Sequence, residues 1–311
     1  MSTYLYICSA ARSGSTLLDM LIGGHPKSAS LGEFSFFGKA LKLNQTCGCG
    51  NKIHECESWH KVINRVKRER GINLLEEPYA LPQWDTNASK VIDYEQQTPL
   101  YLKMAKLRSF ICKLRFSYKN RLRTPLPPSL KSGIENTIYL YNIILEEWDK
   151  SFVIDSSKNM NKAIALYEEK PKQTKLILLT RDGRGVFHSR FSSGFSREQS
   201  LDGWKRYYSN ALKLLNKNIS KEDLLILKYE DLVCDLAGNL TRICEFIGEE
   251  FDESMLDLAA GTRHLVNGNN TMFKRSSGVK FDERWKTDLL EDDLEWFMER
   301  AAKLNQALGY K

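Results

Sequence analysis

Residues 3–16 read Thr-Tyr-Leu-Tyr-Ile-Cys-Ser-Ala-Ala-Arg-Ser-Gly-Ser-Thr, and they indicate the fold class of this 311-residue chain. The run from Thr3 to Cys8 is β-branched, aromatic and apolar, which predicts a buried strand. From Ser15 onward, leucine and isoleucine recur at helical spacing until Gly23 ends the pattern. The segment therefore predicts a strand, a glycine-containing loop and a helix in direct succession.

Three later apolar runs are short, continuous and separated by helical patterns. They are Phe152 to Ile154, Leu176 to Leu179 and Leu224 to Leu227. This alternation predicts an α/β fold with a doubly wound, mainly parallel sheet flanked by helices. Ligands of such sheets bind beyond the carboxyl ends of the strands, so the residues that follow each strand are the candidate site residues. They are Ser9 to Thr16, Asp155 to Lys158 and Thr180 to Arg184.

From about residue 60 to residue 150 the strand signal fades and the chain becomes helical and basic, with a break at Pro125, Pro127 and Pro128. We interpret this part as a helical insertion over the binding edge of one domain spanning residues 1–311. The run from Lys103 to Arg123 contains eight Lys or Arg and no acid. It is interpreted either as a solvated face or as a docking surface for an anionic acceptor, such as an acidic glycan or a lipid headgroup.

An approximate apolar stripe accompanies this basic run and predicts the buried side of a helix. Its members are Leu102, Leu107, Phe110, Ile111 and Leu114. Basic and aromatic side chains mostly separate onto two faces, whereas a nucleic-acid module interleaves them, so we expect no nucleic-acid partner.

The composition indicates a globular protein, with 42% hydrophobic and 27% charged residues. The 46 Lys and Arg exceed the 39 Asp and Glu, and the resulting charge of +7 favours anionic partners. We find no run of about 18 apolar residues and no basic stretch followed by an apolar core at the start. The sequence thus predicts no transmembrane segment and a cytoplasmic location.

The loop from Ser9 to Thr16 lies between the predicted strand and helix, where free backbone N–H groups and the positive helix end attract anions. Gly14 permits close approach of the backbone, and the hydroxyls of Ser15 and Thr16 add donors. The loop lacks the Gly-Lys-Ser/Thr ending that serves Mg²⁺ and a γ-phosphate, which argues against an ATPase or a kinase. By itself it is also compatible with an ordinary strand-to-helix turn.

A second motif, Thr-Arg-Asp-Gly-Arg-Gly-Val-Phe-His-Ser, begins at Thr180. Arg181 comes at the end of a predicted strand, and Ser189 follows about two helical turns later. A guanidinium and a hydroxyl that converge suit a phosphate monoester. The alternative is a surface ion pair between Arg181 and Asp182, which would contribute little.

Together the two motifs resemble those of the sulfotransferases that use 3′-phosphoadenosine 5′-phosphosulfate (PAPS). In that family a 5′-phosphosulfate loop follows the first strand, and a 3′-phosphate motif pairs an Arg with a Ser eight residues later. The likeness is greatest to the branch of protein-tyrosine and bacterial-type sulfotransferases. Further matching segments begin at His25 (His-Pro), Gly32 (Gly-Glu), Tyr229 (Tyr-Glu-Asp-Leu) and Phe246 (Phe-Ile-Gly).

The resemblance implies a P-loop NTPase-like fold and transfer of a sulfuryl group from PAPS to a hydroxyl or amine, with release of the desulfonated nucleotide PAP. It implies a co-substrate site with no metal requirement, formed by Arg12, Ser13, Gly14, Ser15, Thr16, Arg181, Ser189, Lys274 and Arg275. The family's further basic residue for the 3′-phosphate falls near Ser193, so the resemblance leaves open whether Arg190 or Arg197 replaces it.

Catalytic roles also follow from the resemblance. Glu33 falls where the tyrosine branch has its catalytic Glu, and its aromatic neighbours are expected to raise its pKa toward that of a useful base. The alternative for Glu33 is a solvated loop carboxylate. Arg12 is expected to hold the sulfuryl and 5′-phosphate oxygens, and Lys158 to neutralise the leaving phosphate. Asp155 and His188 are weaker candidates for the base.

The acceptor is left open: a small molecule, glycan, lipid or peptide fits, and a tyrosine is not specifically implied. Two other functions remain as alternatives, a nucleotide-binding protein without turnover and a nucleotide-dependent phosphotransferase. The presence of Glu33 and Lys158 argues against an inactive pocket.

A cysteine cluster stands apart from these motifs. Cys47, Cys49 and Cys56 occur with His54 and His60. These are enough ligands for tetrahedral zinc, but their spacing matches no standard zinc pattern. A local disulfide and free thiols are the alternatives, and we expect no metal.

Overall fold

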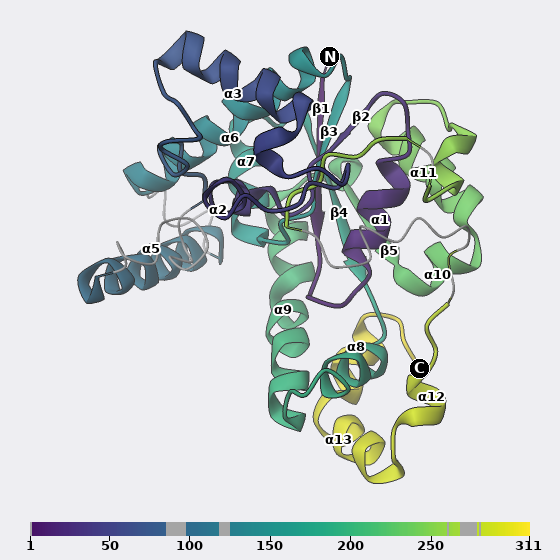
Figure 1. Cartoon of the computed structure of the whole chain (residues 1–311). Helices are drawn as coiled ribbons and strands as arrows, with labels where there is room; N and C mark the ends of the chain where they lie inside the picture. The colour runs from purple at the N-terminus through teal and green to yellow at the C-terminus, as the bar shows by residue number, and fades with distance from the viewer. Residues whose placement is uncertain (1, 85–97, 118–124, 260, 268–278, 280) are drawn as a thin grey trace.

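The computed structural model describes residues 2–84, 98–117, 125–259, 261–267, 279 and 281–311. Within them, five parallel strands form one sheet in the order β2-β3-β1-β4-β5 (Figure 1). The strands are β1 (Thr3–Cys8), β2 (Ser28–Ser30), β3 (Phe152–Asp155), β4 (Thr174–Thr180) and β5 (Leu224–Lys228). The predicted doubly wound parallel α/β fold is confirmed. The short strand β2 was not predicted, because Ser-Ala-Ser carries no apolar strand signal.

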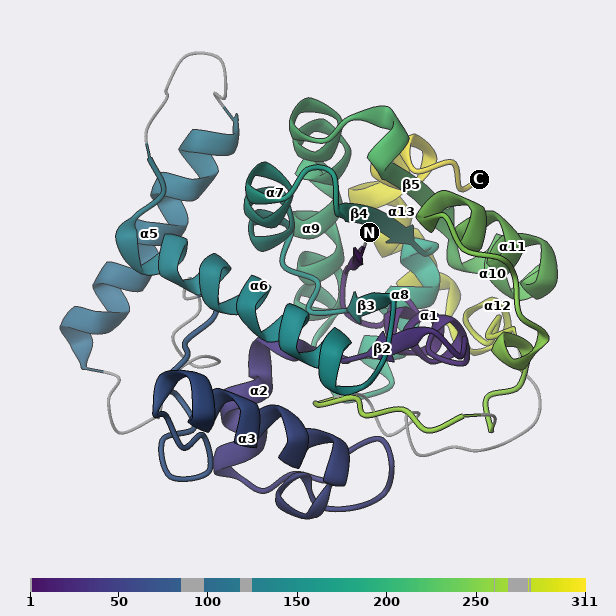
Figure 2. The same ribbon diagram turned by 90° about the horizontal axis from the view of Figure 1, so that it is seen from above.

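Helices cover both faces of this sheet (Figure 2). One face packs against α6 (Pro128–Glu147), α7 (Met160–Glu169) and α9 (Arg197–Asn218), and the other against α1 (Ser15–Ile22), α10 (Tyr229–Cys234) and α11 (Leu236–Ile247). Alternate residues of β1 point to opposite faces, as the pleat of a strand requires. Tyr4, Tyr6 and Cys8 join the core on the α6 side, and Leu5 and Ile7 the core on the α1 side.

Three further helices lie beyond the carboxyl end of β4 (Figure 1). They are α8 (Gly183–Phe191), α12 (Trp285–Asp288) and α13 (Glu291–Ala307). The rings of Phe187, Trp204 and Phe297 pack together between α8, α9 and α13. The Trp204 indole N–H also donates to the Arg181 carbonyl at 3.2 Å. This small core therefore fixes the backbone that carries Arg181.

The segment predicted as a helical insertion contains α3 (Glu57–Arg70), α5 (Pro99–Ser117) and α6, which begins at the predicted proline break. The prediction for the apolar stripe of α5 was wrong. The residues that α5 buries are Ala105, Cys112 and Phe116, whereas Leu107 and Phe110 are about half exposed. Apolar residues occur all round this helix, so packing against α7 and α9 decides which side is buried. Residues 118–123 of the basic run lie outside the described residues.

The remaining described helices are short. They are α2 (Phe37–Lys42) and the 3₁₀ helices η1 (Phe34–Phe36), η2 (Ile53–Glu55), η4 (Lys221–Asp223) and η5 (Glu253–Leu256). Within the described part of the chain, every helix is too short or too polar to cross a lipid bilayer.

Candidate active site

The predicted motifs meet at the carboxyl edge of the sheet, because all five strands are parallel and end on the same side. Following the strand order, Glu33 comes after β2, Lys158 after β3 and the loop from Ser9 to Thr16 after β1. Arg181 follows β4, and Tyr229 follows β5. Residues from five distant parts of the chain thus share one edge.

The loop after β1 exposes the start of α1. Gly14 is the N-cap of α1, no side chain caps this end, and no acid occurs in the first turn. The backbone N–H groups of that turn therefore have no side-chain acceptor and are available to an anion. Gly14 has a φ of 90°, and a Cβ at this position would lie 2.6 Å from the Tyr229 ring. Arg12 also has a left-handed φ, of 71°, which costs free energy in a residue other than glycine and is typical of functional loops.

A tyrosine that the sequence analysis did not identify holds this loop in place. The Tyr208 hydroxyl of α9 donates to the Leu179 carbonyl at 2.6 Å and accepts from the Ala10 N–H at 3.1 Å. It also lies 3.2 Å from Ser13 Oγ. Burial raises the pKa of Tyr208, which keeps the hydroxyl protonated and able to donate. No local sequence pattern identifies Tyr208, because its partners Leu179 and Ala10 lie 29 and 198 residues away in the chain.

The two predicted anion-binding motifs are in direct contact. Arg12 Nε donates to Ser189 Oγ at 3.0 Å, and Arg181 Nη1 donates to the Arg12 carbonyl at 3.0 Å. The Arg181 guanidinium lies over the Tyr229 ring, 4.5 Å from its centroid, and pairs with Asp282 at 3.1 Å. Arg12, Arg181 and Ser189 thus form one hydrogen-bonded cluster at the edge of the sheet.

The alternative ion pair between Arg181 and Asp182 is wrong. Asp182 caps α8 and pairs with Arg184 at 2.6 Å. The Arg284 and Arg181 guanidiniums both donate to Asp282, and together they hold the pKa of that carboxyl well below its usual range.

The two candidates for an additional phosphate ligand make contacts elsewhere. Arg190 donates to the Gln199 carbonyl and lies over Phe195, and Arg197 pairs with Asp293 at 2.5 Å. The other two predicted ligands, Lys274 and Arg275, lie outside the described residues.

Glu33 and Lys158 form an ion pair at the ends of β2 and β3. The Lys158 ammonium donates to Glu33 Oε1, and each side chain is about one fifth exposed. Lys158 has a left-handed φ of 66°, and the Tyr207 hydroxyl donates to its carbonyl at 2.8 Å. The rings next to Glu33 turn inward: Phe34, for example, packs on Trp59. The charged partner of the Glu33 carboxylate is therefore Lys158.

This arrangement agrees with a match to a known family. A model of the sulfotransferase family matches residues 5–253. The chain belongs to the sulfotransferase family. Solved structures agree on the fold: the sulfotransferase domain of the Synechococcus PCC 7002 olefin synthase is 21% identical, with 99% of this chain and 94% of that chain covered and a TM-score of 0.55.

The sulfotransferase domain from the curacin biosynthetic pathway is similar as well. It is 17% identical, with 100% of this chain and 99% of that chain covered and a TM-score of 0.54. A search of curated proteins found no significant match. Sulfuryl transfer is the activity that the family assigns to this chain, and the fold agrees.

In this sulfotransferase the weaker candidates for the base have other partners. Asp155 is buried and accepts from Lys162 Nζ at 3.0 Å and from the Tyr141 hydroxyl at 2.5 Å. Lys162 is itself fully buried and also donates to Gln83, and burial lowers the pKa of its ammonium. His188 lies 3.5 Å from Asp288 of α12. Neither arrangement resembles a base facing a substrate.

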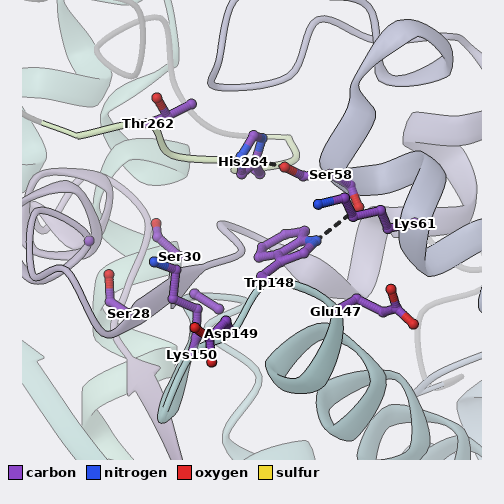
Figure 3. A pocket seen from close by; sticks show the side chains of 12 residues that line it. Ser28, Ser30, Ser58, Lys61, Glu147, Trp148, Asp149, Lys150, Thr262 and His264 are labelled. Atoms are coloured by element: carbon purple, nitrogen blue, oxygen red, sulfur yellow. Dashed lines mark hydrogen bonds between the residues drawn. The ribbon is translucent and has the colours of Figure 1, made fainter.

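A pocket of about 380 Å³ lies along the outer edge of β2 in this sulfotransferase (Figure 3). Its lining includes Ser28, Ser30, Lys61, Trp148 and His264. Among the residues that the structure describes, none of those predicted for catalysis or nucleotide binding lines it. The pocket is therefore separate from the described residues that were predicted to bind the nucleotide.

The cysteine cluster of the sulfotransferase contains a different histidine from those predicted. Cys47, Cys49 and Cys56 are joined by His264, and their ligand atoms all lie within 4.8 Å of one another. His54 instead contacts the Leu41 carbonyl, and His60 contacts the carbonyl of His54. Spacing along the chain does not reveal His264, which lies 208 residues beyond Cys56.

Proposed function

We propose that this sulfotransferase takes its sulfuryl group from PAPS and transfers it to a hydroxyl or amine acceptor, releasing PAP. The observation that carries the proposal is the contact between the two anion-binding motifs, in which Arg12 meets Ser189 and Arg181 meets the Arg12 carbonyl. PAPS carries a phosphosulfate at the 5′ position of its ribose and a phosphate at the 3′ position, so its site needs two anion-binding motifs on one surface. A cytoplasmic location remains a prediction from the sequence.

The motifs divide the nucleotide between them. The first turn of α1, with the hydroxyls of Ser15 and Thr16, would bind the 5′-phosphosulfate together with Arg12. Arg181 and Ser189 would bind the 3′-phosphate, because a guanidinium supplies paired donors to phosphate oxygens. Gly14 fits this role, since the nearby Tyr229 ring leaves no room for a side chain.

The Glu33–Lys158 pair supplies the two functions that the chemical step requires. The acceptor oxygen or nitrogen attacks sulfur while the bond from sulfur to the bridging phosphate oxygen breaks. Glu33 takes the proton of the acceptor, and Lys158 stabilises the negative charge that develops on the leaving phosphate. Because the two groups are in contact, the base and the cation lie side by side.

The change Glu33→Gln tests this mechanism, because glutamine is nearly isosteric but takes no proton. We expect kcat to fall by about 10²–10⁴ while PAP affinity stays within a few-fold of the parent. An acceptor with a more acidic hydroxyl should recover part of the loss. The control is Glu55→Gln on η2, an exposed glutamate that should leave kcat unchanged. A near-parental kcat for Glu33→Gln, with chemistry limiting the rate, would exclude Glu33 as the base.

We further propose that the acceptor carries negative charge. A pocket of about 360 Å³ between α5 and α9 is lined by Lys113, Lys213 and Lys217. It begins at Asn210, one helical turn beyond Tyr207, whose hydroxyl bonds to the Lys158 carbonyl. The three ammonium groups that line this pocket favour an anionic group on the acceptor.

A further inference from the structure

We propose that Cys47, Cys49, Cys56 and His264 bind one zinc ion, which holds the chain around Val266 against the loop that carries Glu33. The first argument is the spacing of the four ligand atoms. Cys49 Sγ lies 3.7 Å from Cys56 Sγ, and His264 Nδ1 lies 3.7 Å from Cys47 Sγ and 3.3 Å from Cys56 Sγ.

These three distances are close to the edges of a tetrahedron around zinc, and all four ligand atoms lie within 4.8 Å of one another. With Zn–S bonds of about 2.3 Å and Zn–N bonds of about 2.05 Å, tetrahedral angles separate two sulfurs by about 3.8 Å, and a sulfur from a nitrogen by about 3.6 Å. A disulfide requires a sulfur separation of about 2.05 Å and would leave one of the three thiols unpaired. The geometry thus favours three thiolates and one imidazole around a single ion.

The surroundings orient His264 as a ligand. Its Nε2 lies 2.9 Å from Ser58 Oγ (Figure 3). An Nε2–H that donates to Ser58 leaves the Nδ1 lone pair directed at the thiols of Cys47 and Cys56. Metal-binding histidines are held by such a second hydrogen bond. The Trp148 ring packs 5.1 Å from the imidazole, and its indole N–H donates to the Ser58 carbonyl. Cys47 and Cys56 are buried, which shields the site from solvent.

The proposed ion would connect two distant segments next to the active site. The Gly48 N–H donates to the Leu265 carbonyl at 3.0 Å, and a Cβ on Gly48 would lie 2.9 Å from the Arg263 carbonyl. Beyond this contact, Val266 accepts from the Glu33 N–H at 3.1 Å and donates to the Leu31 carbonyl at 3.0 Å. His264 is thus connected to the backbone of Glu33 through the next two residues of the chain, Leu265 and Val266. The effect on catalysis rests on the proposed role of Glu33, whereas metal binding does not.

Metal content is the direct test. The full chain, produced with zinc and purified under reducing conditions without chelator, should contain about one zinc per molecule. Replacing zinc by Co²⁺ should give the strong visible absorption of a tetrahedral site and charge-transfer bands from thiolate to cobalt. Both measurements use the unaltered protein, so they do not depend on whether a variant folds.

Variants then identify the histidine. His264→Ala should reduce zinc occupancy to a small fraction after gel filtration, whereas His60→Ala, the matched control, should retain one zinc. Ser58→Ala should weaken zinc binding by about 10–100-fold. Removing zinc should lower kcat more than it lowers PAP affinity, because Glu33 is positioned through Val266.

Three results would overturn the proposal. One is unaltered protein without zinc whose three thiols all react with an alkylating agent. Another is a Cys49–Cys56 disulfide found by mass spectrometry of the reduced preparation. The third is full zinc occupancy in His264→Ala. If zinc binds but Glu33→Gln is fully active, the metal site stands and the role of Glu33 does not.

Discussion

Asp19 is a carboxyl group buried beneath the carboxyl edge of the sheet. It accepts from the hydroxyls of Ser30 and Ser156, both at 2.5 Å. Burial raises the pKa of Asp19 to about 7, although the two serine hydrogen bonds oppose this shift. The side chain links α1, the residue at the end of β2 and the residue that follows β3. One titrating group therefore connects three elements that lead into the active site.

This raised pKa predicts a component of the pH dependence of stability. The unfolded chain loses the Asp19 proton near pH 4, whereas the folded chain keeps it up to about pH 7. The contribution of Asp19 to the free energy of unfolding is full below about pH 4. It is lost as the pH rises to about 7, by at most about 1.4 kcal/mol per pH unit. Asp19→Asn should remove this slope, which urea unfolding at pH 4.5 and pH 7 measures.

The control for this experiment is Asp202→Asn on the exposed side of α9. It should keep the pH dependence of the parent. If Asp19→Asn also keeps that dependence, Asp19 does not hold its proton in the folded state.

At the scale of elements, the loop from β1 to α1 depends on a glycine for two separate reasons. Gly14 has a left-handed φ of 90°, and its Cα faces the Tyr229 ring. Gly50 has a similar φ of 98° with nothing within 4 Å of a Cβ. Comparing a substitution at Gly14 with the same substitution at Gly50 therefore separates the effect of a steric clash from the effect of backbone strain.

We predict that Gly14→Ala lowers PAP affinity by at least about tenfold. The methyl group would push against Tyr229 and shift the first turn of α1, whose N–H groups are proposed to bind the phosphosulfate. Gly50→Ala should cost only about 1 kcal/mol of stability and leave PAP affinity unchanged. Titration calorimetry with PAP and thermal unfolding measure the two effects. Parental PAP affinity in Gly14→Ala would show that this turn does not bind the nucleotide.

At the scale of the whole molecule, the chain has a net charge of +7, and three of its lysines lie together around the pocket between α5 and α9. Changing Lys113, Lys213 and Lys217 together to Gln should raise the acceptor KM several-fold with PAP affinity nearly unchanged. The KM of the parent should also rise with salt, because ions screen exposed charges. Steady-state kinetics at two salt concentrations test both expectations.

A matched triple variant separates the pocket from the overall charge. Lys67, Lys172 and Lys303 are exposed and lie outside the pocket, and changing them to Gln removes the same charge. This variant should keep the parental KM. Equal increases in KM for both triple variants would contradict an acceptor site in the pocket.

The sequence by itself determined the local order of the chain. Four of the strands, the helix after the first loop and the positions of both predicted anion-binding motifs follow from patterns of a few residues. Apolar periodicity and loop chemistry reflect backbone conformation and burial. The sequence also predicted that the motifs lie together at the carboxyl edge of the sheet, because parallel strands end on the same side.

Only the tertiary structure decided which side chains meet. The strand order β2-β3-β1-β4-β5 brings Arg12 to Ser189 and Glu33 to Lys158, and the fold brings Cys56 to His264. These partners are 177, 125 and 208 residues apart. A local pattern carries no information on strand order or on which side of a helix packs against the core. Only the assembled fold therefore shows the strand β2, the buried side of α5 and the fourth member of the cysteine cluster.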